Sequence, residues 1–254
     1  MNFITITNSG YDFFCDSQIE NFSLDFMGSH KLTIYCADEN SFSRLSSRIF
    51  PINIEIKKIE GQNITGNHSY LEGRFKELMK LKFPIILNRL KENKDDIWFV
   101  DNDVLFLKSP SQEDIDPNKD VIFQADMGES EHMNSWVCTG CFYLKNNERT
   151  INFLEKIIEY QDSVDRGEQE ALNDYCKSWP DNGPFSPDVV GSILDFKEAN
   201  LGVLPFYLYQ NGRLAFFYDQ YNKHDCVMIH FNHEKDFSKK IENFKKTKNY
   251  YFKK

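Results

Sequence analysis

The segment that decides the fold is Ile97–Leu107, which reads IWFVDNDVLFL. Its first four residues, Ile97–Val100, form a continuous apolar run, which is typical of a strand buried on both faces of a sheet. Asp101 and Asp103 follow directly, and residues at i and i+2 of an extended chain project to the same side. Two carboxylates facing one way are costly unless a cation neutralises them, and hard oxygen ligands suit Mg²⁺ or Mn²⁺. The segment therefore predicts a buried strand that ends at a divalent-metal site, with a solvated Asp-Asn-Asp turn as the alternative.

The residues before this segment alternate between strand and helix patterns. Hydrophobic spacing predicts strands near residues 3–7, 31–36, 52–56 and 97–100, and helices near 12–27, 39–48 and 69–92. Pro84 falls inside the longest helix and should either kink it or open a new first turn. Strands that alternate with helices imply the α/β class, with a mostly parallel sheet flanked by helices and ligands at the carboxyl ends of its strands.

The second half of the chain follows a different pattern. It predicts short strands near residues 121–124, 137–144 and 227–230, helices near 149–161 and 167–177, and a loop region punctuated by proline and glycine from 180 to 191. No linker or internal repeat interrupts it, so we expect an elaboration packed on the sheet within one domain, 1–254. That domain is divided into a first half, 1–110, a second half, 111–234, and a C-terminal tail, 235–254.

Composition excludes several classes of protein. The 254 residues carry 30 basic and 39 acidic side chains, a net charge of -9, which argues against a nucleic-acid binder with a basic face. The hydrophobic fraction of 41%, with 15% aromatic residues, is enough for a core and argues against disorder. No stretch approaches the ~20 apolar residues of a membrane span, and the N-terminus lacks the pattern of a signal peptide. We therefore expect a cytoplasmic protein with reduced cysteines, and we interpret Cys138 and Cys141 as strand residues because no second such pair is present.

The charge is unevenly distributed along the chain. The tail 235–254 holds eight lysines against Asp236 and Glu242, a local charge of +6, which leaves -15 on the other 234 residues. This placement suits a chain end that closes over an anionic ligand. Contact with an acidic partner or with a membrane surface is the alternative.

Two enzyme classes use an acidic pair after a hydrophobic strand. In a haloacid-dehalogenase phosphatase, Asp101 would be the nucleophile and Asp103 the general acid. That fold usually starts with this strand and needs a downstream acidic pair for Mg²⁺, and neither condition is met here. In nucleotide-sugar transferases the pair lies mid-chain after a nucleotide-binding half, as it does in this sequence.

Six blocks in order resemble the nucleotide-diphospho-sugar transferase family of GT-A glycosyltransferases, with plant and viral members. They are Thr5–Tyr11, Trp98–Pro110, Val137–Tyr143, Glu168–Glu170 with Asn173, Leu204–Pro205 with Asn211–Gly212, and His230–Asn232 with Lys239–Lys240. Three positions depart from the family pattern: Cys138 stands in place of asparagine, Glu168 in place of aspartate and Asp236 in place of glycine. The resemblance implies a GT-A fold, with a Rossmann-like sheet and an elaborated C-terminal half.

The resemblance also implies a metal site and a donor site. Asp101, Asp103 and His230 would hold Mn²⁺ or Mg²⁺, with a histidine that merely caps a strand as the alternative for His230. The residues implied to bind the nucleotide-sugar donor are Thr7, Asn8, Tyr11, Lys82, Asp101, Asn102, Asp103, Thr139, Gly140 and Lys239. Ordinary turn chemistry is the alternative for the first three, and a solvated side chain is the alternative for either lysine, with Lys80 as a rival to Lys82.

The resemblance implies transfer of a hexose-type unit from a nucleotide diphosphate sugar, UDP-linked, to a hydroxyl of a glycan or glycoconjugate. An inverting enzyme needs a carboxylate base, for which Asp126 and Asp188 are candidates, whereas a retaining one would place Gln169 beside the sugar. Both outcomes stay open. The competing hypotheses are the phosphatase and a sugar-binding relative without catalysis.

Overall fold

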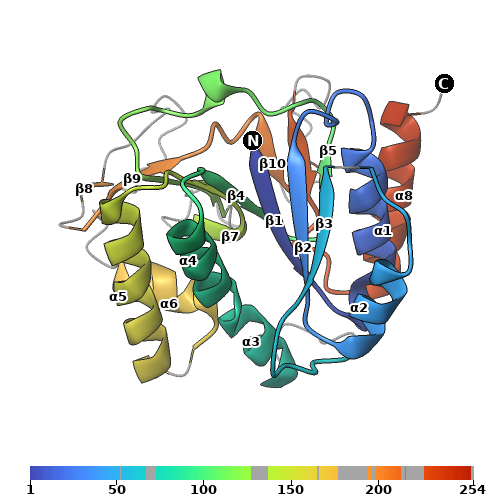
Figure 1. Ribbon diagram of the computed structural model, residues 1–254. Helices are drawn as coiled ribbons and strands as arrows, with labels where there is room; N and C mark the ends of the chain where they lie inside the picture. Colours follow the sequence, from blue (N-terminus) through green and yellow to red (C-terminus); the bar gives the residue numbers. More distant parts are fainter. Residues whose placement is uncertain are drawn as a thin grey trace.

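A computed structural model describes residues 1–51, 53–66, 73–126, 137–164, 166–176, 194–195, 198–212, 215 and 226–252. A central sheet carries helices on both faces (Figure 1). Its strands are β1 (Asn2–Thr7), β2 (Lys31–Cys36), β3 (Ile54–Lys58), β4 (Ile97–Val100), β6 (Val121–Ala125), β7 (Val137–Leu144), β8 (Leu194–Asp195) and β9 (Asn200–Val203). The α/β class predicted from the alternating patterns is confirmed.

The sheet has the strand order β3-β2-β1-β4-β7-β6-β9-β8. The first four strands pair in parallel, β7 is antiparallel to both β4 and β6, β9 is parallel to β6, and β8 is antiparallel to β9. Six of the eight strands therefore run in one direction, so the mostly parallel sheet is confirmed. Strands from both halves of the chain share this one sheet, while the division into 1–110, 111–234 and 235–254 stays a prediction.

The described helices are α1 (Asp12–Phe22), α2 (Glu39–Ser46), α3 (Gly73–Lys80), α4 (Lys82–Glu92), α5 (Glu148–Val164), α6 (Glu168–Tyr175) and α8 (Phe237–Phe252), with short 3-10 turns at Ser9–Tyr11 and Gln112–Asp114. The helical pattern predicted over 69–92 forms two helices that meet at Leu81, so the alternative in which Pro84 opens a new first turn is confirmed. Pro84 lies in the first turn of α4, where its missing N–H costs no hydrogen bond.

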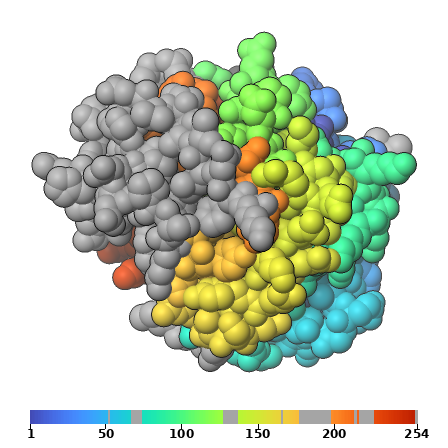
Figure 2. Space-filling model, turned by 90° about the vertical axis from the view of Figure 1, so that its left-hand side faces the viewer, coloured from blue at the N-terminus to red at the C-terminus, as the bar shows by residue number. Residues whose placement is uncertain are grey.

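The run Ile97–Val100 lies between two hydrophobic layers. Its four side chains are all buried, and they alternate between one cluster with α4 and α5 and another with α1 and α2. In the space-filling view, α5 and α6 form the lower part of the visible surface, in yellow and light orange (Figure 2). Both faces of β4 are therefore covered, as its continuous apolar sequence predicts.

A second, smaller sheet joins distant parts of the chain. It has the order β10-β11-β5, from β10 (Tyr209–Asn211), β11 (Met228–His230) and β5 (Val104–Phe106). The predicted extended conformation of the acidic segment is therefore wrong: residues 101–103 form a turn in which the Val104 amide donates to the Asp101 carbonyl at 3.2 Å. β4 and β5 leave this turn in different sheets, so the turn stands where the two sheets meet.

The basic tail is a helix that packs on the rest of the protein. α8 lies beside α1 at one side of the molecule (Figure 1). Its residues Phe237 and Phe244 make edge contacts with Phe14, and Phe244 also contacts Phe231. The lysines of the tail thus belong to a helix whose aromatic side anchors it. Among the described residues, no helix is both long and apolar enough to cross a lipid bilayer.

Candidate metal centre and surrounding residues

Asp101, Asp103 and His230 converge at the carboxyl end of β4. One ligand atom from each lies within 4.8 Å of the other two. The His230 Nε2 atom is 3.2 Å from Asp103 Oδ1 and 3.8 Å from Asp101 Oδ2. The pairing of β11 with β5 produces this meeting, because it aligns His230 with Val104, the residue directly after the acidic turn. The small sheet therefore brings together three ligands that are far apart in sequence.

The acidic turn is fixed by side chains that face away from the metal centre. Asn102 accepts a hydrogen bond from Thr5 Oγ1 at 3.0 Å and donates to the Ile6 carbonyl at 2.8 Å. Gln18, on α1, donates to the Asp101 carbonyl at 3.1 Å. Because the amide of Asn102 is buried against β1, the structure places this residue as an anchor of the turn. Its predicted donor contact stays a prediction.

Two lysines and the imidazole compensate the acidic pair. Burial works to raise the pKa of Asp103, but the Lys240 ammonium, at 2.8 Å, and His230 outweigh it, so this pKa lies well below its usual range. Burial raises the pKa of Asp101 above its ordinary value, and Lys82 and His230 offset only part of that rise. Asp103 thus keeps its negative charge, and the cluster has the carboxylate oxygens and imidazole nitrogen that Mn²⁺ accepts as ligands. The residues present fit a divalent cation.

Lys82 is a buried cation between two carboxylates. Its Nζ atom lies 3.2 Å from Asp101 Oδ1 and 2.9 Å from Glu168 Oε1, and it donates to the Thr139 carbonyl at 2.9 Å. Burial alone would lower the pKa of Lys82, but Asp101 and Glu168 together raise it above its ordinary value. With a side chain only 1% exposed, Lys82 is not a solvated lysine, and it joins α4, α6 and β7 behind the acidic turn.

The start of α6 is docked on the start of β7. The Gln169 side chain accepts a hydrogen bond from the Thr139 amide at 3.1 Å and donates to Asp126 Oδ2 at 2.9 Å. The Asn173 side chain bonds both the amide and the carbonyl of Val137, at 2.8 and 2.9 Å. The predicted catalytic residues Asp126 and Gln169 are therefore in direct contact, next to the strand that carries Thr139 and Gly140.

Comparison with known proteins decides the family. The family model described as nucleotide-diphospho-sugar transferase matches residues 28–244. The chain belongs to that family. No curated protein matches it by sequence.

Solved structures of glycosyltransferases share the fold of this family member. A glycosyltransferase involved in glycosylation of the major capsid of PBCV-1 aligns with a TM-score of 0.55 and 11% identity, over 96% of this chain and 98% of its own. The galactosyltransferase LgtC, in complex with donor and acceptor sugar analogs, aligns with a TM-score of 0.56 and 9% identity, over 97% and 96%. GlyE from Streptococcus pneumoniae TIGR4 gives a TM-score of 0.55 and 12% identity, over 96% and 60%. The GT-A fold and the glycosyltransferase assignment are confirmed, and the phosphatase alternative loses its support.

The other predicted donor residues of this glycosyltransferase lie around the end of β1. Thr7 and Asn8 are fully buried, and the Asn8 side chain accepts from the Gly10 amide and donates to the Gly66 carbonyl, both at 3.0 Å. The Tyr11 ring contacts Phe237 of α8. Turn chemistry thus already occupies Asn8, and nucleotide contacts of these three residues stay predictions.

Two lysines of α8 differ in position. Lys239, the predicted donor ligand, is exposed, whereas its neighbour Lys240 is the one that reaches Asp103. Asp188, the second candidate base, lies outside the described residues. Cys138 and Cys141 are free, buried residues of β7, as predicted, and burial raises the pKa of the Cys138 thiol well above its ordinary value.

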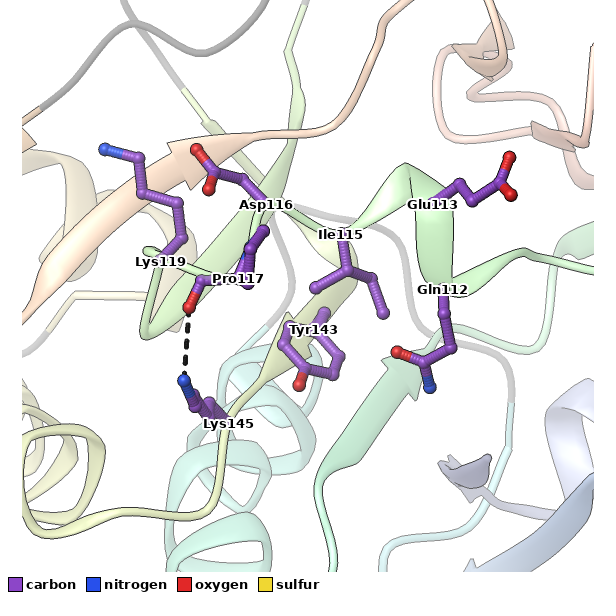
Figure 3. Close-up of a pocket in the computed structure, with 8 residues that line it drawn as sticks. All are labelled: Gln112, Glu113, Ile115, Asp116, Pro117, Lys119, Tyr143 and Lys145. Carbon is purple, nitrogen blue, oxygen red and sulfur yellow. Dashed lines mark hydrogen bonds between the residues drawn. The ribbon is translucent and has the colours of Figure 1, made fainter.

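A cavity elsewhere in the molecule is separate from the metal centre. Its volume is about 500 Å³, and Figure 3 shows its lining, which includes Ile115, Lys119, Tyr143 and Lys145. Tyr143 lies at the far end of β7 from Gly140, so at about 3.3 Å per residue the two are roughly 10 Å apart along the strand. This hollow therefore stays outside the metal centre.

Gly140 has no side chain, and this leaves room for His230 and Asp101 to meet beside it. A methyl group at this position would come within 2.7 Å of His230 Nε2 and 2.8 Å of Asp101 Oδ2. We expect Gly140→Ala to weaken Mn²⁺ binding at least ~10-fold and to lower the melting temperature by several degrees, since overpacking costs roughly 1–3 kcal/mol. Electron paramagnetic resonance (EPR) titration of Mn²⁺ and thermal unfolding measure the two effects. Gly167→Ala is the matched control, because its nearest neighbour is 4.0 Å away; equal Mn²⁺ affinity in the two variants contradicts the prediction.

Proposed function

We propose that this protein is a divalent-metal-dependent glycosyltransferase that moves a sugar from a nucleotide diphosphate sugar, a UDP-sugar, to a hydroxyl group of a glycan or glycoconjugate. The observation that carries the proposal is the cluster of Asp101, Asp103 and His230 at the carboxyl end of β4, in a chain of the nucleotide-diphospho-sugar transferase family. Ligands of open α/β sheets bind at this end of the strands.

The reaction requires charge compensation for the departing diphosphate. A bound Mn²⁺ or Mg²⁺ would supply Lewis acidity at the sugar-phosphate bond. The chain's own contribution is to hold two carboxylate oxygens and one imidazole nitrogen at one point, with Asn102 and Gln18 keeping the acidic turn rigid. A preorganised site of this kind lowers the barrier because no protein groups have to reorient during the reaction.

The sugar side of the proposed site is formed by Asp126, Gln169 and Thr139. The hydrogen-bonded row from Thr139 through Gln169 to Asp126 presents an amide and a carboxylate where β6 ends and β7 begins. In an inverting reaction Asp126 would accept the acceptor proton as a base; in a retaining reaction Gln169 would contact the transferring sugar. The anomeric configuration of the product distinguishes these two roles.

Lys240 is the lysine of α8 that we assign to the diphosphate. Its Nζ atom already lies at the acidic turn, 2.8 Å from Asp103 Oδ2, with a side chain only 15% exposed. We expect Lys240→Met to weaken UDP binding by about 10- to 100-fold, because hydrogen bonds to charged groups contribute roughly 1.5–3 kcal/mol. Lys239→Met, one residue away and exposed, should change the affinity less than ~3-fold. Calorimetric titration with UDP and Mn²⁺ compares the pair, and the reverse order of effects would restore Lys239 as the donor ligand.

A donor screen tests the proposed function. The melting temperature is measured with Mn²⁺ and a panel of nucleotide diphosphate sugars, and each stabilising donor is then assayed for hydrolysis and for transfer to sugar acceptors. UDP-sugars should stabilise the protein most and should be hydrolysed or transferred. Stabilisation without any turnover would favour the sugar-binding relative, and no stabilisation by any donor contradicts the proposal.

The lysines of the C-terminal tail bear on which partners, besides the donor, the protein binds. Several lysines of α8 are engaged within the protein, since Lys246 pairs with Glu242, Lys248 pairs with Glu20, and Lys245 lies over the Phe13 ring. We propose that the principal partners are the donor and a glycan acceptor, without nucleic acid. A peripheral membrane contact through the tail and a cytoplasmic location stay predictions.

A further inference from the structure

Gln124 lies behind His230, on the side away from the two carboxylates. Its side chain is completely buried, and its Oε1 atom is 2.9 Å from His230 Nδ1. Its Nε2 atom donates to the Tyr209 carbonyl at 3.2 Å. The three residues belong to β6, β11 and β10, so this one amide joins the central sheet to the small sheet.

The alternation of β6 places the amide there. Val121, Phe123 and Ala125 pack in the cluster with α4 and α5, whereas Ile122 packs in the opposite cluster, which contains Tyr209 of β10. Gln124 follows this alternation and therefore points to the same side as Ile122, toward the small sheet. The pairing of β6 with β7 changes register between Phe123 and Gln124, after which Gln124 aligns with Cys138.

The hydrogen bonds of Gln124 determine which imidazole nitrogen carries a proton. The Tyr209 carbonyl only accepts, so the amide nitrogen of Gln124 must face it, and the amide oxygen must face His230. That oxygen also only accepts, so Nδ1 must be the donor. The neutral ring then carries its lone pair on Nε2, the atom that lies 3.2 Å from Asp103 Oδ1.

We infer that Gln124 is a positioning residue that fixes the Nδ1–H form of His230 and thereby presents Nε2 to the divalent cation. The cation rests on the function proposed above, whereas the proton on Nδ1 does not. A second atom near Nδ1 is the Cys138 sulfur at 3.6 Å, which is a weak acceptor. Without Gln124 the opposite tautomer would become accessible, and its Nε2–H would point at the acidic pair and block coordination.

Two variants of Gln124 separate positioning from packing. Gln124→Met keeps the length of the side chain but removes the acceptor, whereas Gln124→Glu keeps an acceptor for Nδ1–H. We expect Gln124→Met to weaken Mn²⁺ binding by about 10- to 100-fold, the usual effect of losing the partner of a ligating histidine, and Gln124→Glu to restore most of the affinity. Gln161→Met, at another buried glutamine on α5, is the matched control and should leave Mn²⁺ affinity unchanged.

Nitrogen NMR of the metal-free protein with ¹⁵N-labelled histidine gives a readout that does not depend on metal binding. The His230 Nδ1 signal should be that of a protonated nitrogen in the wild type and should change in Gln124→Met. Failure of the wild type to bind Mn²⁺ would overturn the proposed function while this signal still tests the positioning. An unprotonated Nδ1 in the wild type, or equal Mn²⁺ affinity in wild type and Gln124→Met, overturns the inference.

Discussion

Replacing Asp103 by asparagine is expected to reduce Mn²⁺-dependent sugar transfer by about 1,000-fold. The Asp103 carboxylate is the point where His230 Nε2 and Lys240 Nζ meet, at 3.2 and 2.8 Å. An amide removes the negative charge from a buried position, so the site loses an anionic ligand and leaves Lys240 uncompensated. Metal-ion stabilisation of a leaving group contributes several kcal/mol, and each 1.36 kcal/mol is tenfold in rate. Initial rates of transfer or of donor hydrolysis at saturating Mn²⁺ measure the effect.

The control for this variant is an aspartate outside the site. Asp162 is exposed on α5, and Asp162→Asn should leave the rate within ~2-fold of the wild type. An EPR titration in parallel shows whether the loss in Asp103→Asn comes from metal binding. Retention of wild-type activity by Asp103→Asn would show that the carboxylate is not a ligand of the reacting complex.

The second large effect is expected on stability, from Lys82→Met. The lysine and methionine side chains have similar lengths. Methionine, however, leaves the buried carboxylate of Glu168 without its cation and removes the partner of Asp101 Oδ1. Breaking a buried ion pair by removing one partner costs roughly 3–5 kcal/mol. For a protein of this size that corresponds to a fall in melting temperature of about 10 °C, measured by calorimetry or circular dichroism.

A second substitution tests whether charge causes the loss. In the double variant Lys82→Met with Glu168→Gln, the uncompensated carboxylate is gone, and a large part of the lost stability should return. Lys91, on the same helix, pairs with Glu155 at the surface, so Lys91→Met should cost at most ~1 kcal/mol. If the single and double variants melt at the same temperature, the ion pair is not what Lys82 contributes.

Periodicity in the sequence predicts the central sheet well, because local patterns are enough for it. The apolar run Ile97–Val100 is a strand buried on both faces, and the alternation before it gives the parallel strands β1 to β4. Because Asp101 directly follows this strand in the sequence, its place at the carboxyl end of the parallel strands is predicted as well. These features need only the neighbours in sequence and the rule for parallel sheets.

The turn at residues 101–103 depends on contacts that are distant in sequence. β5 leaves the line of β4 because it pairs with β11, more than 120 residues later, and no local pattern near Asp101 signals that partner. The direction of the two carboxylates is therefore a property of the second sheet. This is why the extended conformation predicted for residues 101–103 is wrong.

Which of the two lysines lies near Asp103 depends on how α8 is rotated about its axis. Lys239 and Lys240 are adjacent, but on a helix they point about 100° apart, and only Lys240 turns inward. The aromatic spacing from Phe237 to Phe244 gives a signal for the buried side of α8, and it could have separated the two lysines. Gln124 gives no such signal, because its partners Tyr209 and His230 lie 85 and 106 residues later in the sequence, on two strands of the small sheet.

Calorimetric titration of the wild-type protein with UDP, in the presence and absence of Mn²⁺, tests the central claim most directly. The metal centre formed by Asp101, Asp103 and His230 predicts that UDP binds with Mn²⁺ present, that the affinity falls at least ~10-fold when the metal is chelated, and that Asp103→Ala loses this dependence. Absence of UDP binding by the wild type, or binding that is the same with and without Mn²⁺ and in Asp103→Ala, would contradict the account.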